Sequence, residues 1–167
     1  MANLTRDFFI GLSNNEFLNK SAKKWGFRLG AEQFVAGTNV DQVLQTVNRL
    51  NAKGISCTVD NLGEFVTEKE ESLAAKDTIL EVIRRIHEEQ LNCHISVKLT
   101  QLGLDIDNQF CLDNMKDIVG AAKTHGIFVN IDTEDYAHYE QTMWVLNELL
   151  KEYDNVGTVI QSYLFRA

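Results

Sequence analysis

Four predicted strands, each carrying a polar residue at or near its carboxyl end, constrain the fold of this chain most strongly. The strands are ISCTVD (55–60), HISVKL (94–99), IFVNID (127–132) and VGTVIQSY (156–163). They recur about every 30 to 40 residues with helical patterns between them, which is typical of βαβ units and a parallel sheet. The polar residues are Asp60, Lys98, Asp132 and Gln161. Because the carboxyl ends of parallel strands converge on one ligand-binding face, we expect these four side chains to lie close together.

Hydrophobic periodicity predicts the helices between these strands. One helix is expected to open at Thr38, with Asp41 completing a capping box, and to close before Gly54; the next begins near Thr67 with Glu70 as its capping partner. Further helices are predicted over 14–25, 108–125 and 135–152, and FVAG (34–37) is predicted as an additional short strand. The chain is therefore expected to be a single domain, 1–167, with a leading helical segment (1–33) followed by five strands (34–167).

The polarity of the strands favours a barrel over an open, doubly wound sheet. Apolar and polar residues alternate along 55–60, 94–99 and 127–132, whereas a sheet covered by helices on both faces is apolar on both. In a barrel, one face of each strand meets the helices and the other lines the interior. A (βα)8 barrel needs about 250 residues, and this chain has 167. We therefore expect a partial, TIM-like (βα)8 barrel whose C-terminal strands are missing from the sequence.

Composition narrows the function classes. The formal net charge of −8 disfavours nucleic acid as a partner, because phosphate binding needs clustered Lys and Arg. No run of about 20 apolar residues predicts a membrane span, and the N-terminus does not resemble a signal peptide. Three cysteines without CxxC spacing indicate reduced thiols and a cytoplasmic protein.

Several candidate site residues also have an ordinary structural interpretation. Lys98 could bind an anionic group, or it could be a strand-edge lysine; burying it in mid-strand without a partner would be costly. Asp132 could act in catalysis or cap the following helix. Glu64, in the DNLGE turn, could belong to the site or to a solvated loop, and Gly63 suggests unusual backbone freedom there. The histidines lack metal-ligand spacing, so no metal is expected, and no GxGxxG follows a strand.

Four segments in order and spacing resemble the flavin-dependent proline dehydrogenases. They are RLGAEQFVAGTNVDQVLQTVNRLNAKGISCTVDNLGE, ISVKLTQLG, VNIDTED and VIQSYLFRA. The leader NKSAKKWGFRLGA is similar to that of the bacterial single-function form. The resemblance implies a distorted (βα)8 barrel that binds FAD, oxidises L-proline to 1-pyrroline-5-carboxylate and passes electrons to a membrane quinone, with peripheral membrane contact for that step.

The resemblance also implies roles for individual residues. Lys98 falls where the family binds the proline carboxylate, and Asp132 falls on the catalytic aspartate. Thr133 and Gln161 fall on flavin-contacting positions. Glu64 falls where a carboxylate pairs with an arginine over the active site. The sequence lacks the RLVKGAY-like segment of the next strand, the flavin-phosphate contacts and the tandem arginines of the last helix.

Two other functional interpretations remain open from the sequence. A Schiff-base lyase or aldolase would use Lys98 as its nucleophile. The chain could also be an inactive remnant of a split gene. Because a partial barrel leaves sheet edges unpaired, we expect either a complementing C-terminal chain or self-association.

Overall fold

The computed structural model describes residues 35–162. Its elements, in chain order, are α3 (Val40–Asn51), β1 (Cys57–Asp60), α4 (Lys69–Glu88), β2 (Cys93–Val97), α5 (Asn108–Thr124), β3 (Val129–Ile131), α6 (Tyr139–Leu149) and β4 (Val156–Thr158). The chain divides into two compact units, the first ending at Thr46 and the second starting at Val47. The sheet lies wholly in the second unit.

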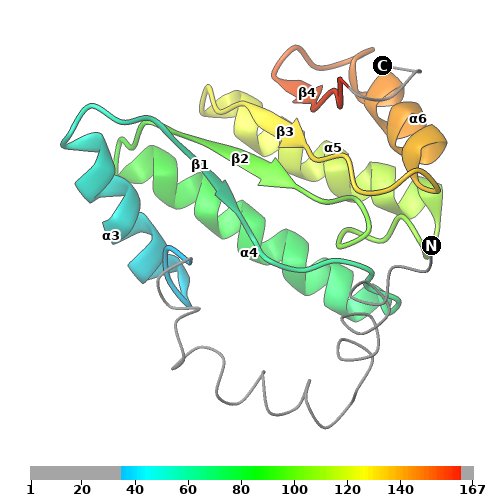
Figure 1. Cartoon of the computed structure of the whole chain (residues 1–167), viewed down its shortest axis with the longest axis horizontal. Coiled ribbons are helices and arrows are strands. Elements are labelled where there is room, and N and C mark those ends of the chain that lie inside the picture. The colour runs from blue at the N-terminus through cyan, green and yellow to red at the C-terminus, as the bar shows by residue number, and fades with distance from the viewer. Residues whose placement is uncertain (1–34, 163–167) are drawn as a thin grey trace, which may run out of the picture. The chain divides into compact units, whose positions relative to one another are not determined.

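The strands form one parallel sheet in the order β1-β2-β3-β4. Each strand is joined to its neighbour through a helix, and right-handed crossovers taken in this order place every connecting helix on the same face. Figure 1 shows α4 and α5 side by side along one face of the sheet. The expected α/β architecture with a parallel sheet is therefore confirmed. Its strands follow one another in chain order with the connecting helices on one face, which agrees with the apolar and polar faces of the strands.

The described residues contain four strands, not five. The strand predicted over 34–37 is wrong for residues 35–37, and Phe34 lies outside the described residues, as does the predicted helix 14–25. The carbonyl of Ala36 accepts a hydrogen bond from the hydroxyl of Thr46 at 2.9 Å and takes no part in a strand ladder. This segment leads into the helix and is no part of the sheet.

Two helix starts differ from the sequence prediction. Asn39 caps α3, its Oδ1 accepting from the Gln42 amide at 3.0 Å, while Gln42 Oε1 accepts from the Thr38 amide. The capping pair is therefore Asn39 with Gln42, one residue later than expected. Helix α4 begins at Lys69, preceded by Glu68, whose side chain makes no cap hydrogen bond.

The apolar face of the sheet and the inner faces of the helices form the core. The hydrophobic pattern of 108–125 predicts Met115, Ile118, Val119 and Ala122 as inward residues, and all four are buried on α5. The hydrophobic pattern predicts Tyr136, Tyr139, Met143, Leu146 and Leu150 as the inward stripe of α6, but of these only Leu146 belongs to the buried stripe. It consists of Thr142, Val145, Leu146 and Leu149, whereas Tyr136 is 72% exposed and Leu150 is 49% exposed. The helix starts at Tyr139, so the segment before it never adopts the helical phase that the pattern assumed.

No helix in the described range 35–162 is both long and apolar enough to span a bilayer.

Candidate functional site

A charged cluster lies at the carboxyl ends of the first three strands. Asp60 is the last residue of β1, Lys98 follows β2, and Asp132 follows β3. The backbone amide of Asp132 donates to the carbonyl of Val97 at 2.9 Å, which continues the ladder and sets Asp132 beside Lys98. Lys98 Nζ lies 2.8 Å from Asp60 Oδ2 and 3.8 Å from Asp132 Oδ2. Of the four side chains predicted to converge, Asp60, Lys98 and Asp132 do so; Gln161 lies instead in a pocket lined by Thr133 and neighbouring residues.

Polar side chains on the helix-free face of the sheet orient Asp132. Ser96 on β2 and Asn130 on β3 are register partners. Both donate to Asp132 Oδ1, Ser96 Oγ at 2.7 Å and Asn130 Nδ2 at 2.8 Å. Asn130 Nδ2 also lies 3.1 Å from Ser96 Oγ. With one oxygen fixed by two neutral donors, Asp132 keeps its other oxygen directed to Lys98. Asp132 is held by the strands and does not cap the following helix, because α6 begins at Tyr139 and its N-cap residue is His138.

Electrostatics keep Lys98 protonated. The hydrogen bond to Asp60 raises the pKa of Lys98, and the charges of Asp60, Asp132 and Glu134 add to it, against the opposing effect of partial burial. Schiff-base chemistry needs a neutral amine, which proteins obtain by lowering the lysine pKa. The cluster has the opposite effect, and this argues against the lyase or aldolase interpretation. The protonated Lys98 is the positively charged member of this cluster.

Asp60 has a more specific place in this cluster than the sequence indicated. Its position at the end of a strand predicted that Asp60 would lie near Lys98. The short contact between the two depends, in addition, on side-chain geometry. Its second oxygen, Oδ1, is buried and has no hydrogen-bond partner in the part of the chain described. Asp60 is therefore a positioning residue for Lys98.

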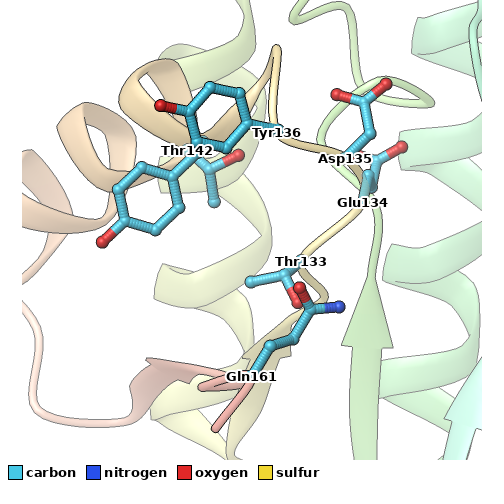
Figure 2. A pocket seen from close by; sticks show the side chains of 7 residues that line it. Thr133, Glu134, Asp135, Tyr136, Thr142 and Gln161 are labelled. Carbon is cyan, nitrogen blue, oxygen red and sulfur yellow. The ribbon is translucent and has the colours of Figure 1, made fainter. Parts of the chain in front are cut away.

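A small pocket of about 80 Å³ opens beside the cluster, after β3 and β4. It is lined by Thr133, Glu134, Asp135, Tyr136, Tyr139, Thr142 and Gln161. Figure 2 shows Gln161 next to Thr133, with Tyr136 over Thr142 on one side and the acidic pair Glu134 and Asp135 on the other. Thr133 and Gln161, the two residues expected to contact a cofactor, thus lie in one pocket.

Glu64 does not join the cluster. It is exposed and makes no hydrogen bond or ion pair with residues 35–162. The turn that carries it lies close to Gln101, because a Cβ on Gly63 would lie 2.3 Å from Gln101 Nε2. Close approach, then, accounts for glycine at this position. The left-handed backbone expected in this turn occurs instead at Phe65, with φ of 54°.

Thr100 and Glu134 connect the three strand-end loops, a function that the sequence did not reveal. Glu134 Oε1 accepts from the Thr100 amide at 3.1 Å, and its other oxygen accepts from the Thr100 hydroxyl. The same hydroxyl accepts from the Phe65 amide at 3.1 Å. Thr100 is fully buried, so the carboxylate of Glu134 reaches into the structure and fixes the segment that lines the pocket.

His138, in the same segment, lies between the carboxylates of Asp135 and Asp105. Its Nδ1 lies 2.7 Å from Asp135 Oδ1, and its Nε2 lies 2.8 Å from Asp105 Oδ1. Both ring nitrogens can donate only if the imidazole is doubly protonated. The hydrogen bonds to Asp105 and then to Asp135 raise the pKa of His138, while burial opposes the shift. The two carboxylates on either side of His138 thus favour its protonated form.

This arrangement predicts a pH-dependent loss of stability. A raised pKa in the folded state means that the stabilisation is complete below the unfolded value of about 6.5 and is lost as pH rises through the folded value. The thermal unfolding midpoint should therefore fall with rising pH in this interval, and the fall should be smaller in His138→Gln. Thermal melts followed by circular dichroism test this. If the unfolding midpoints of the two proteins change equally with pH, His138 makes no pH-dependent contribution to stability.

No group of three or more His, Cys, Asp or Glu side chains in the described part of the chain is arranged to hold a metal ion.

Comparison with known proteins identifies related sequences and a related fold. The profile of the family described as "Proline dehydrogenase" matches residues 43–167. "Proline dehydrogenase 1" of Bacillus subtilis (strain 168) is 42% identical over 98% of this chain and 54% of its own length. "Proline dehydrogenase" of Deinococcus radiodurans is 32% identical over 87% of this chain and 47% of its own length. The chain thus spans about half the length of these relatives.

A solved structure shares the fold. Proline utilization A from Bdellovibrio bacteriovorus, inactivated by N-propargylglycine, superposes with a TM-score of 0.75 at 24% sequence identity. The match covers 89% of this chain and 18% of that protein.

Proposed function

This chain belongs to the proline dehydrogenase family, a family of oxidoreductases, and we propose that it forms the N-terminal part of an FAD-dependent barrel that oxidises L-proline to 1-pyrroline-5-carboxylate. Residues 34–167 would supply its first strands, after the leading segment 1–33, and further strands would close the barrel. The proposed reaction is the first step in the breakdown of proline to glutamate.

The observation that carries this proposal is the cluster of Lys98, Asp60 and Asp132 beside the pocket that contains Thr133 and Gln161. Proline oxidation requires a held carboxylate, a held ring amine and a hydride acceptor at a fixed position. Lys98 offers the charge for the carboxylate. Asp132, with its orientation set by Ser96 and Asn130, offers a fixed negative charge near the amine.

The charge balance of the cluster supports a zwitterionic substrate. Two carboxylates surround one ammonium, so the cluster as a whole is negative. A simple anion would be repelled, whereas an amino acid brings a cationic amine as well as a carboxylate. Further positive charge for the carboxylate would come from the part of the barrel that completes the site, and Glu64 would pair there with an arginine.

The pocket residues would suit one edge of a flavin ring. Thr133 and Gln161 can donate to ring heteroatoms, and Tyr136 and Tyr139 add aromatic surface. Glu134 and Asp135 make the same pocket unsuitable for phosphates, which would be bound by other residues. When bound, the flavin supplies the hydride acceptor. Thr133 and Gln161 would orient it over the substrate held by Lys98 and Asp132.

Partners and location follow from the same proposal. Electrons would leave to a membrane quinone through a peripheral contact of a cytoplasmic protein. A second, C-terminal segment would complete the barrel.

Replacing Lys98 with Met tests the proposed function. The host is a complemented enzyme, in which the 167-residue chain is co-expressed with the C-terminal half of the Bacillus subtilis relative. Losing one charge-assisted contact of about 1.5–3 kcal/mol should raise the proline KM roughly ten- to hundred-fold. The flavin content per protein should change little.

Lys76→Met is the matched control. Lys76 also pairs with an aspartate, Asp117, at 2.8 Å, but it lies on α4, away from the strand ends. Its loss should leave the proline KM unchanged. If Lys98→Met impairs only folding and the KM of the folded enzyme is unchanged, Lys98 has a structural role and the substrate assignment fails.

A further inference from the structure

Two cysteines face each other across the first two strands, at the end of the sheet opposite the charged cluster. Cys57 begins β1 and Cys93 begins β2, and the two are register partners in the parallel ladder. Register partners on neighbouring parallel strands project their side chains to the same face. Both thiols are reduced.

The separation of the strands suits a disulfide. Neighbouring strands lie about 4.8 Å apart, and disulfides bridge Cα atoms about 4.4–6.8 Å apart. The two sulfurs also affect each other electrostatically. Burial, and next the neighbouring Cys57, raises the pKa of Cys93 to about 12.

The two thiols differ in accessibility, which sets an order of reaction. Cys57 is partly exposed, and its hydrogen bonds within residues 35–162 are long, 3.8 Å to the Ile55 carbonyl and 3.9 Å from Asn51 Nδ2. Cys93 is 5% exposed, and its sulfur donates to the His94 carbonyl at 3.3 Å. An oxidant from solution would therefore meet Cys57 first, and Cys93 would be the resolving thiol.

We propose that Cys57 and Cys93 form a modification site, a thiol pair that hydrogen peroxide converts to an intramolecular disulfide. The Cys57 thiolate attacks peroxide, an S–O bond forms as the O–O bond breaks, and hydroxide leaves as water after protonation. The Cys93 sulfur then attacks the Cys57 sulfur and displaces the second hydroxide, which leaves as water with the proton from Cys93. Two thiols are oxidised and one peroxide is reduced.

The cross-link would join the two strands that carry Asp60 and Lys98 at their other ends. Asp60 lies three residues after Cys57 in β1, and Lys98 follows the end of β2. Oxidation would thus restrain the sheet directly below the charged cluster. This inference does not depend on the proposed function.

The test treats the 167-residue chain, in complex with the co-expressed C-terminal half of the Bacillus subtilis relative, with hydrogen peroxide, and follows the thiols of this chain by peptide mass spectrometry. Free thiols should fall from three to one, and peptide mass spectrometry should find Cys57 linked to Cys93. Dithiothreitol should restore all three thiols. Cys111 should remain reduced because it is fully buried and its sulfur lies 3.6 Å from the Leu99 carbonyl.

Variants make the assignment specific. Cys57→Ser and Cys93→Ala should each abolish the linked peptide, while Cys111→Ala should retain it. The proposal is overturned if the treated chain keeps Cys93 reduced while Cys57 ends as a sulfinic or sulfonic acid. It is also overturned if non-reducing electrophoresis shows only disulfides between chains.

Discussion

Asp132→Ala is expected to lower kcat of the complemented enzyme by roughly a hundred-fold, the size of effect produced by removing one preorganised group at a reacting centre. The side chain accepts from Ser96 and Asn130 and faces Lys98. Its loss would leave two donors without their acceptor and Lys98 with a single carboxylate partner. Steady-state kinetics with proline and an artificial electron acceptor, together with the flavin absorption spectrum, measure the result.

Asp132→Asn separates charge from shape in this experiment. The amide oxygen can still accept from Ser96 and Asn130, so the fold should be retained, but the negative charge beside Lys98 is removed. If both Ala and Asn leave turnover within about twofold of wild type, Asp132 acts only structurally. The remaining effect would then be the loss of the hydrogen bonds from Ser96 and Asn130, about 1 kcal/mol of stability each.

The sheet could be predicted from the sequence because period-2 alternation is a strong local signal. The three segments with this pattern contain β1, β2 and β3, and the apolar residues Ile95, Val97, Val129 and Ile131 of β2 and β3 are buried. The segment at 34–37 is also short and apolar, but its residues do not alternate between apolar and polar and so do not favour pairing with a neighbouring strand. A strand exists only with a partner, and composition alone does not provide one.

Helix boundaries and phase depended on contacts that periodicity does not encode. The start of α3 is decided by the reach of the Gln42 side chain to Thr38. The start of α6 is delayed to Tyr139, just after Asp135 and His138 form their ion pair. Each of these is a side-chain interaction that competes with the helical pattern.

The candidate site followed from topology, whereas its detailed geometry did not. Strand-end position brought Asp60, Lys98 and Asp132 together, and it placed Thr133 beside Gln161. The hydrogen bonds between Thr100 and Glu134 join two loop residues that are 34 positions apart in the sequence. Loop contacts of this kind have no periodic signature, so sequence reasoning could not find them.

The sheet has two edges without a strand partner among residues 35–162, one on β1 and one on β4. Unpaired edges favour association with another chain. Among residues 35–162, Lys98 is also the one cation that pairs with Asp60 and Asp132, and an amino-acid carboxylate would need further positive charge. Both features predict that proline oxidation requires a complementing C-terminal segment in addition to this chain.

Size-exclusion chromatography with flavin absorbance, followed by a proline-dependent dye-reduction assay, tests this central claim most directly. The 167-residue chain alone should elute as an oligomer or aggregate, carry little FAD and not oxidise proline. Co-expression with the C-terminal half of the Bacillus subtilis relative should give a yellow, proline-oxidising complex. A monomeric, yellow and active sample of the chain alone would contradict the partial-barrel account, and a colourless, inactive co-purified complex would contradict the proposed site.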